Sequence, residues 1–257
     1  MPANAAQVLV EAAACVDRGV RGAMATVVAR YGSVPGTPGQ KLFLGKDGTC
    51  LGSVGGGALE REVIEMLARM LEAEGAAFET RTIKLGAELG MCCGGRVDVF
   101  VEVLDALVPC LLVGGGHVAS AVAPLLTKIG FAVTIVDERE AWGDKPRPEG
   151  VQCVTGDFDD VGKAIDRSGV CLVMTHDHAL DQKAIEWALS RKFAFVGGVG
   201  SRAKAERTRQ RLEAKGFSEE DRSRVRMPIG LDIGARLPEE IAVAIAAEMV
   251  RWRTEKK

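Results

Sequence analysis

The chain has few of the side chains that enzymes most often use for acid–base chemistry. Its 257 residues include three histidines and one tyrosine, and aromatic residues make up only 5%. No run of about 18 uninterrupted apolar residues is present, which excludes an ordinary membrane-spanning helix. The formal net charge is −2, so no overall electrostatic field would draw the chain to nucleic acid or to anionic lipid. Any partner must therefore be recognised by local motifs.

The sequence also lacks the pattern of a targeting segment and of a disulfide framework. The first 20 residues have no basic region, and Gln7, Glu11 and Asp17 interrupt their apolar residues, which is typical of an amphipathic helix and not of a signal peptide. The seven cysteines are an odd number scattered along the chain, a pattern that favours free thiols in a reducing compartment. We therefore expect a cytoplasmic protein.

The most informative stretch lies near the middle of the chain. An apolar run ends at residue 113, the motif Gly114-x-Gly116-x-x-Ala119 follows, and a second apolar run ends at Asp137. This is the pattern of a dinucleotide-binding βαβ unit, in which the first glycine allows a tight turn and the second lets the backbone approach a pyrophosphate. The carboxylate of Asp137 would accept hydrogen bonds from a ribose. The alternative is a domain of the same fold whose nucleotide pocket is empty or repurposed.

The organisation of the chain changes at residues 105–109, which we interpret as a linker. Residues 1–104 combine two helices with short strands and glycine-rich connections, which predicts a compact α+β domain. Residues 110–257 alternate strand and helix, which predicts a parallel sheet covered on both faces. The predicted fold class is α/β, with a C-terminal Rossmann-like doubly wound sheet preceded by a smaller α+β domain.

The elements of the second domain are predicted from hydrophobic periodicity. We expect strands at 110–114, 132–136, 151–154, 170–174 and 193–196, and helices at 117–129, 157–167, 179–191, 201–215 and 238–252.

The three histidines all follow predicted strands of this sheet. His117 comes after the first strand, and Thr175-His176-Asp177-His178 comes after a later one. That later strand should lie beside the first, so the imidazoles should meet at the carboxyl edge of the sheet, where ligands bind. We expect them to contact a ligand or to handle a proton. One alternative is a metal site, because His-x-His on an extended chain places both rings on one side; another is simple capping and packing of the loop.

A further strand-to-helix connection ends in Gly200-Ser201-Arg202. Ser201 is a suitable N-cap, but Arg202, Lys204 and Arg207 crowd the first turns, where the helix dipole disfavours positive charge. An anion bound to the free N–H groups would explain these cations. The alternative is a solvated basic face.

Two adjacent cysteines, Cys92 and Cys93, lie between glycines in the segment 90–95. Adjacent cysteines rarely bond to each other, and one segment alone does not form a tetrahedral zinc site. The flanking glycines favour exposure and the close approach of a ligand, which predicts a functional thiol. Cys110 and Cys171, inside predicted strands, are instead expected to be inert core.

A set of motifs in a characteristic order covers nearly the whole chain. They are Gly32-Ser-Val-Pro-Gly-Thr-Pro-Gly39, Gly52-Ser-Val-Gly-Gly-Gly-Ala-Leu-Glu60, Gly90-Met-Cys-Cys-Gly-Gly95, Val113-Gly-Gly-Gly-His-Val118, Met174-Thr-His-Asp-His-Ala-Leu-Asp181, Gly200-Ser-Arg202 and Gly230-Leu-Asp-Ile-Gly234. With these motifs the chain resembles the XdhC/CoxI family, the accessory proteins of molybdenum hydroxylases such as xanthine dehydrogenase and carbon monoxide dehydrogenase.

This resemblance implies a maturation factor and cofactor chaperone more than a turnover enzyme. Such a factor binds the molybdenum cofactor, as molybdopterin or its dinucleotide form. It protects the cofactor while a sulfur donor, a cysteine desulfurase, installs the terminal sulfido ligand, and hands it to the apo-hydroxylase. The resemblance also implies a homodimer. The family's cysteine matches Cys93, which becomes the candidate contact to molybdenum, with Cys92 standing where relatives often carry a small residue. Ala58 stands where some relatives place a second cysteine.

The residues themselves suit that task. Glycine loops and helix N-termini bind phosphates, which makes Gly55-Gly56-Gly57 a third candidate beside the loops at Gly114–Gly116 and Gly200. Thr175, Asp177 and His178 would read the pterin or a nucleotide, and a thiolate suits a soft metal.

Two other functions remain open at this point. One is an NAD(P)-dependent oxidoreductase acting on a small substrate, although the chain has no Tyr-x-x-x-Lys and Tyr31 lies outside the Rossmann half. The other is a nucleotide-sensing regulatory module, which would not need the cysteine segment.

Overall fold

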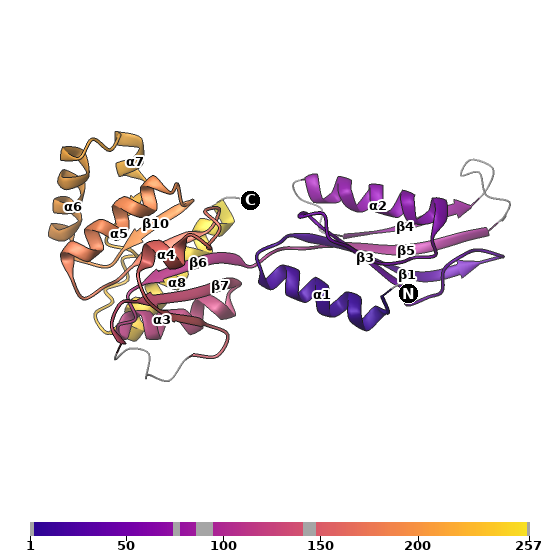
Figure 1. The fold of residues 1–257 in the computed structure, drawn as a ribbon, viewed down its shortest axis with the longest axis horizontal. Helices are drawn as coiled ribbons and strands as arrows, with labels where there is room; N and C mark the ends of the chain where they lie inside the picture. The colour runs from indigo at the N-terminus through magenta and orange to yellow at the C-terminus, as the bar shows by residue number, and fades with distance from the viewer. Residues whose placement is uncertain (1–2, 74–77, 86–94, 141–147, 256–257) are drawn as a thin grey trace. The chain divides into compact units, whose positions relative to one another are not determined.

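The computed structural model describes residues 3–73, 78–85, 95–140 and 148–255. The chain divides into two compact units, Met1–Leu107 and Val108–Lys257, each of which has its own sheet and its own core (Figure 1). The predicted fold class is confirmed: one unit is α+β with an antiparallel sheet, and the other carries the parallel sheet of a Rossmann-like domain.

The first unit is a five-stranded antiparallel sheet with two helices. Its elements are α1 (Ala5–Asp17), β1 (Gly22–Tyr31), β2 (Lys41–Gly45), β3 (Cys50–Gly52), α2 (Gly57–Glu72), β4 (Phe78–Leu85) and β5 (Gly95–Leu104). The strand order is β3-β2-β1-β5-β4. Alternate residues of a strand face opposite sides of a sheet, so Ala23 and Ala25 pack into the core with α2, whereas Met24 packs with α1.

The second unit is a six-stranded parallel sheet with helices on both faces. Its elements are β6 (Val108–Val113), α3 (His117–Lys128), β7 (Phe131–Asp137), β8 (Gln152–Thr155), α4 (Phe158–Gly162), β9 (Val170–Val173), α5 (His178–Ser190), β10 (Phe195–Gly198), α6 (Arg202–Ala214), α7 (Glu219–Ser223), β11 (Val225–Arg226) and α8 (Pro238–Glu255). The strand order is β11-β10-β9-β6-β7-β8. As predicted, β9 lies beside β6, and the carboxyl edge between them is the switch point at which doubly wound sheets bind ligands.

Two apolar layers enclose this parallel sheet. Leu112 packs in one core with Leu126 of α3 and Ile245 of α8, and α3 itself lies against α8. Leu111, the neighbouring residue, packs on the other face with Ile185 of α5. Burial on both faces explains why these strands are continuous apolar runs. None of the described helices is long and apolar enough to span a membrane.

The prediction of a helix over 157–167 is wrong in length, because α4 ends at Gly162. A Cβ built on Gly162 would lie 2.2 Å from the Trp187 ring, so the glycine lets the chain pass close to α5. A polar turn follows, in which Asp166 Oδ1 accepts a hydrogen bond from Ser168 N at 2.7 Å.

The strand predicted at 193–196 is shifted, and its glycines belong to the strand. Gly197 and Gly198 pair with Leu172 and Val173 of β9. A Cβ on Gly197 would lie 2.3 Å from Ile229 Cδ1, so close packing on the sheet requires the missing side chain. The elements α7 and β11 lie in a charged segment with no apolar run to predict them.

Candidate functional site

The turn between β6 and α3 has the geometry that its two glycines predict. Gly114 has a φ of +101°, and a Cβ there would lie 2.7 Å from the Met174 carbonyl oxygen. A side chain does not fit, because the turn passes against the chain leaving β9. Gly116 is the N-cap of α3; no side chain caps this helix in the part of the chain described, and a Cβ on Gly116 would meet nothing within 4 Å. The first turn of α3 therefore offers backbone N–H groups to open space, an arrangement that binds phosphate.

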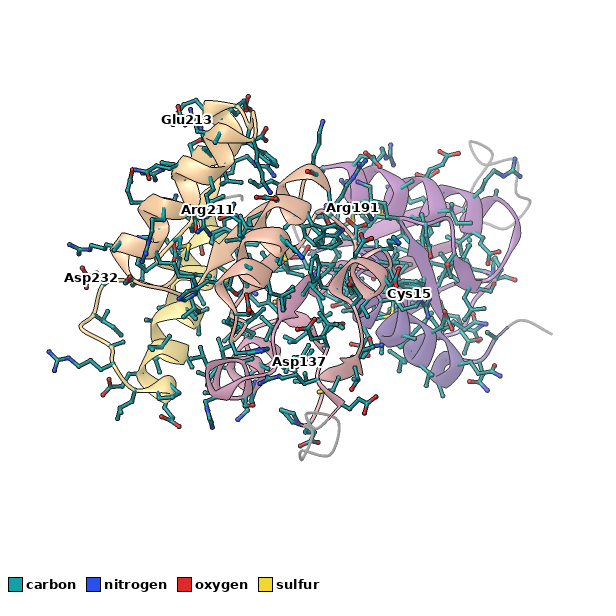
Figure 2. All side chains as sticks on the ribbon, turned by 60° about the vertical axis from the view of Figure 1, so that its left-hand side comes forward. Cys15, Asp137, Arg191, Arg211, Glu213 and Asp232 are labelled. Atoms are coloured by element: carbon teal, nitrogen blue, oxygen red, sulfur yellow. The ribbon has the colours of Figure 1, made fainter. Side chains whose placement is uncertain are left out.

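Asp137 ends β7 with a side chain that is only 3% exposed (Figure 2). Its Oδ2 accepts hydrogen bonds from Gly115 N at 2.7 Å and from Arg139 Nη2 at 2.6 Å, and its Oδ1 accepts from Arg139 N at 3.0 Å and Nε at 2.8 Å. Burial alone would raise the pKa of Asp137, but these hydrogen bonds and the guanidinium charge outweigh it and hold the pKa at about 2. The ionised carboxylate therefore stabilises the glycine turn through its hydrogen bond from Gly115 N. Since both oxygens are occupied, the predicted ribose contact requires Arg139 to move aside.

A pocket at this edge joins the glycine turn to α4 and α5. It is lined by Val113, Gly114, Val136, Asp137, Glu138, Gly156, Asp157, Phe158, Thr175, His176 and Leu180. These residues follow or end strands β6, β7, β8 and β9, whose carboxyl ends meet at one edge. Four of the residues predicted from the sequence are thus brought together: Gly114, Asp137, Thr175 and His176.

The three histidines lie at the carboxyl edge of the sheet, and all are exposed. His117 begins α3 and His178 begins α5, while His176 lies in the loop just before α5. Of the three, His176 lines the pocket. Within the described ranges, no group of three His, Cys, Asp or Glu side chains could hold a metal ion. Contact between these imidazoles and a ligand stays a prediction, for which His176 is the best placed.

Asp177 has a structural role in the loop after β9. It is the N-cap of α5, and its Oδ1 accepts hydrogen bonds from Ala179 N at 2.5 Å and from Leu180 N at 2.9 Å. The hydrogen bonds from Leu180 N and Ala179 N lower the pKa of Asp177. A role in reading a pterin or nucleotide, predicted for this carboxylate, would have to be combined with capping.

A buried ion pair that no sequence motif reveals holds the same edge together. Asp181 is 2% exposed, and its Oδ1 accepts hydrogen bonds from Thr175 N at 2.9 Å and Thr175 Oγ1 at 2.7 Å. Its Oδ2 pairs with Lys204 Nζ, which also donates to the Val199 carbonyl oxygen at 3.1 Å. The pair therefore ties the loop after β9 to the loop after β10. Its two members lie 23 positions apart in the chain, beyond the reach of local patterns.

Two of the cations at the N-terminus of α6 form ion pairs with carboxylates of the protein itself. Ser201 caps the helix as predicted, accepting a hydrogen bond from Lys204 N at 3.2 Å. Arg202 Nη2 lies 3.0 Å from Asp232 Oδ2, and both side chains are exposed. Because Arg202 and Lys204 both have carboxylate partners, their presence does not require a bound anion. Gly200 lines a second pocket, together with residues of the loop before α8.

The glycine loop of the first unit is likewise occupied by a side chain. Glu60 Oε2 accepts hydrogen bonds from two backbone N–H groups of the loop, one of them Gly56 N at 3.3 Å. A Cβ on Gly55 would lie 2.7 Å from Gly36 N, so two glycine-rich loops pack backbone to backbone. A phosphate at Gly55–Gly57, as predicted, would have to displace the Glu60 carboxylate.

The candidate thiols, Cys92 and Cys93, lie outside the described residues, and their role stays a prediction. Cys110 and Cys171 are fully buried, and burial raises the pKa of both thiols. These two are inert core, as the strand pattern predicts.

The strand order, the glycine turn and the switch-point pocket define a Rossmann-fold domain, here following a separate α+β unit. Comparison with known families gives a more particular result. The XdhC Rossmann domain matches residues 110–249, and the XdhC and CoxI family matches residues 15–83. The chain belongs to the XdhC and CoxI family.

Two curated proteins show how far the similarity extends. The uncharacterized protein YqeB of Escherichia coli (strain K12) is 31% identical over 248 residues, which are 95% of this chain and 46% of that protein. A protein of Bacillus subtilis (strain 168), described as a probable subunit of xanthine dehydrogenase, is 29% identical over 159 residues, 61% of this chain and 46% of that one. The chain thus spans about half the length of the curated relatives it matches.

A crystal structure of a xanthine dehydrogenase from Bacillus halodurans superposes with a TM-score of 0.54 at 18% identity. The match covers 97% of this chain and 96% of that one. At this identity the likeness shows the fold alone.

Proposed function

We propose that this chain is an accessory factor for a molybdenum hydroxylase of the xanthine dehydrogenase type. In this role it binds the molybdenum cofactor and supports its sulfuration and insertion. The observation that carries the proposal is the family match over both units. The relative from Bacillus subtilis, whose name places it in a probable xanthine dehydrogenase, adds support.

The described residues fit the phosphate end of such a cofactor. The uncapped first turn of α3, next to the open side of Gly116, offers N–H donors to an anion. The Asp137 carboxylate holds that turn in place through Gly115 N. When bound, the cofactor supplies the redox-active centre of the hydroxylase. The chain's own part is to hold its phosphate and shield it, with Cys93 as the soft thiolate ligand.

The partners follow from this role. We propose an apo-hydroxylase as the acceptor, a cysteine desulfurase as the sulfur donor and a homodimer as the working form. Each is open to test by co-purification of the tagged full-length chain.

A complementation experiment tests the function. In cells lacking this protein, the hydroxylase should be present but inactive for want of sulfurated cofactor, and the wild-type chain should restore its activity. Cys93→Ser replaces a soft sulfur by a hard oxygen at similar volume, so it should restore little activity. Cys92→Ser is the matched control and should restore most of it. Full hydroxylase activity without the protein would refute the accessory role, and full rescue by Cys93→Ser would refute the thiol role.

A further inference from the structure

One edge of the antiparallel sheet is a long strand with an outer side that pairs with no strand among the described residues. The strand order places β4 at this edge, where it pairs with β5 on its inner side. The other edge strand, β3, has three residues, whereas β4 has eight. An edge strand of this length presents a row of backbone N–H and C=O groups to which another strand can be added.

The side chains of β4 also suit contact with a further strand. Phe78 is 68% exposed, and its ring lies 6.3 Å from that of Phe100 on one face of the sheet. Glu79 and Arg81 lie on the opposite face, the one on which Ile83 packs into the core with α2. Arg81 Nε is 2.9 Å from Glu79 Oε2. An added strand would therefore meet an exposed aromatic ring on one face and one charge of each sign on the other.

We propose that β4 pairs with β4 of a second copy of this chain, antiparallel about a two-fold axis at Thr80. In a symmetric antiparallel pair one residue lies opposite its own copy, and its neighbours pair outward from it. With Thr80 at the centre, Glu79 lies opposite the partner's Arg81, and Phe78 lies opposite the partner's Thr82. Thr–Thr, opposite-charge and aromatic–β-branched pairs are the kinds that stabilise a sheet. Every pair over residues 78–82 is of one of these kinds.

The charges select this register over its neighbours. An axis at Glu79 or at Arg81 would place like charges opposite each other, which is destabilising. An axis at Thr82 would place Arg81 opposite the partner's Ile83 and leave the guanidinium without a cross-strand carboxylate. Charged side chains on an edge strand usually prevent such pairing. Here they are complementary to their own copies when Thr80 is at the axis.

This inference names the interface of the homodimer proposed above, and it rests on that proposal for the oligomeric state alone. The evidence for the interface is the edge strand, whether or not the chain binds a cofactor. Hydroxylase complementation tests the accessory role, and measurement of the mass in solution tests the interface. The two proposals can therefore fail separately.

Sedimentation velocity of the full chain and of two charge variants provides the test. The wild type should sediment with twice the mass of a single chain. Glu79→Arg and Arg81→Glu, each alone, place like charges opposite each other at two positions, so each should raise the dimer dissociation constant about tenfold or more. An equimolar mixture of the two variants restores opposite charges at both positions. The mixture should therefore form a heterodimer about as tightly as the wild type forms its homodimer.

Arg209→Glu is the matched control, because it makes the same charge change at a residue that is 56% exposed on α6, in the other unit. This variant should remain dimeric, and circular dichroism should show that all variants are folded. A monomeric wild type would overturn the inference. Single variants that dimerise as tightly as the wild type would show that the dimer uses another surface, and a mixture that does not associate would exclude this register.

Discussion

At the scale of single residues, Asp137 is expected to have two roles. The acid at this position of the dinucleotide-binding pattern binds a ribose, and in this chain it also stabilises the glycine turn. Its carboxylate accepts four hydrogen bonds from the backbone and the side chain around it. Two of the donors belong to the guanidinium of Arg139, which is 41% exposed. A ribose that replaced the guanidinium would exchange one set of hydrogen bonds for another. The acid at the end of β7 therefore stabilises the glycine turn and remains suited to a nucleotide.

The lowered pKa of Asp137 predicts a pH-dependent contribution to stability. The folded-state pKa is about 2, below the unfolded value of about 3.9. The stabilisation is therefore complete above pH 4 and is lost as the pH falls from about 4 to about 2. Its size is about 2–3 kcal/mol at most. Urea unfolding of wild type and Asp137→Asn should show this difference at pH 6 and a shrinking difference below pH 4. The exposed Asp160→Asn should show no such change, and a pH-independent difference for Asp137→Asn would contradict the assignment.

At the scale of elements, the pair Asp181–Lys204 connects the N-terminal turns of α5 and α6. The carboxylate is 3% exposed and the ammonium group's side chain 15%, so both charges are largely out of water. Removing one member leaves the other without a partner, which costs far more than replacing both. Through Thr175, the same pair also positions the loop that carries His176 into the pocket.

A double-mutant cycle tests this connection. Lys204→Met should lower the free energy of unfolding by about 3–5 kcal/mol, because it leaves the buried Asp181 carboxylate without its charged partner. Adding Asp181→Asn should recover a substantial part of that loss, since the amide keeps a carbonyl acceptor for Thr175. Urea unfolding of the two single variants and the double variant measures the coupling. Additive single effects would show that the two side chains do not interact in solution.

At the scale of the whole molecule, the chain consists of two units with separate cores. The second unit contains its own sheet and two apolar layers, and Trp252 packs edge-on against Phe195 at 5.6 Å within it. A domain with a complete core is able to fold alone.

We therefore expect residues 108–257, expressed separately, to unfold cooperatively. The near-UV circular dichroism of the isolated unit should show a single thermal transition, because Trp187 and Trp252 both pack within it. Loss of the near-UV signal at low temperature would show that the first unit is needed for folding.

The sequence by itself determined what depends on neighbours along the chain. The motif Gly114-x-Gly116 between two apolar runs predicted the turn, and the alternation of strand and helix predicted the parallel sheet with β9 beside β6. The order of short motifs predicted the family. Periodicity and turn chemistry are local signals, because they follow from the geometry of a helix, a strand or a glycine.

Only the tertiary structure decided which of the predicted groups are already occupied. Glu60 fills the glycine loop of the first unit, and Asp181 neutralises Lys204 from another helix. Gly197 is a strand residue because Ile229 leaves no space above it. Such pairings join residues that are distant in the chain or face each other only after packing. They leave no periodic pattern in the sequence. Their effect on stability depends on how deeply the groups are buried and on whether each buried charge has a partner.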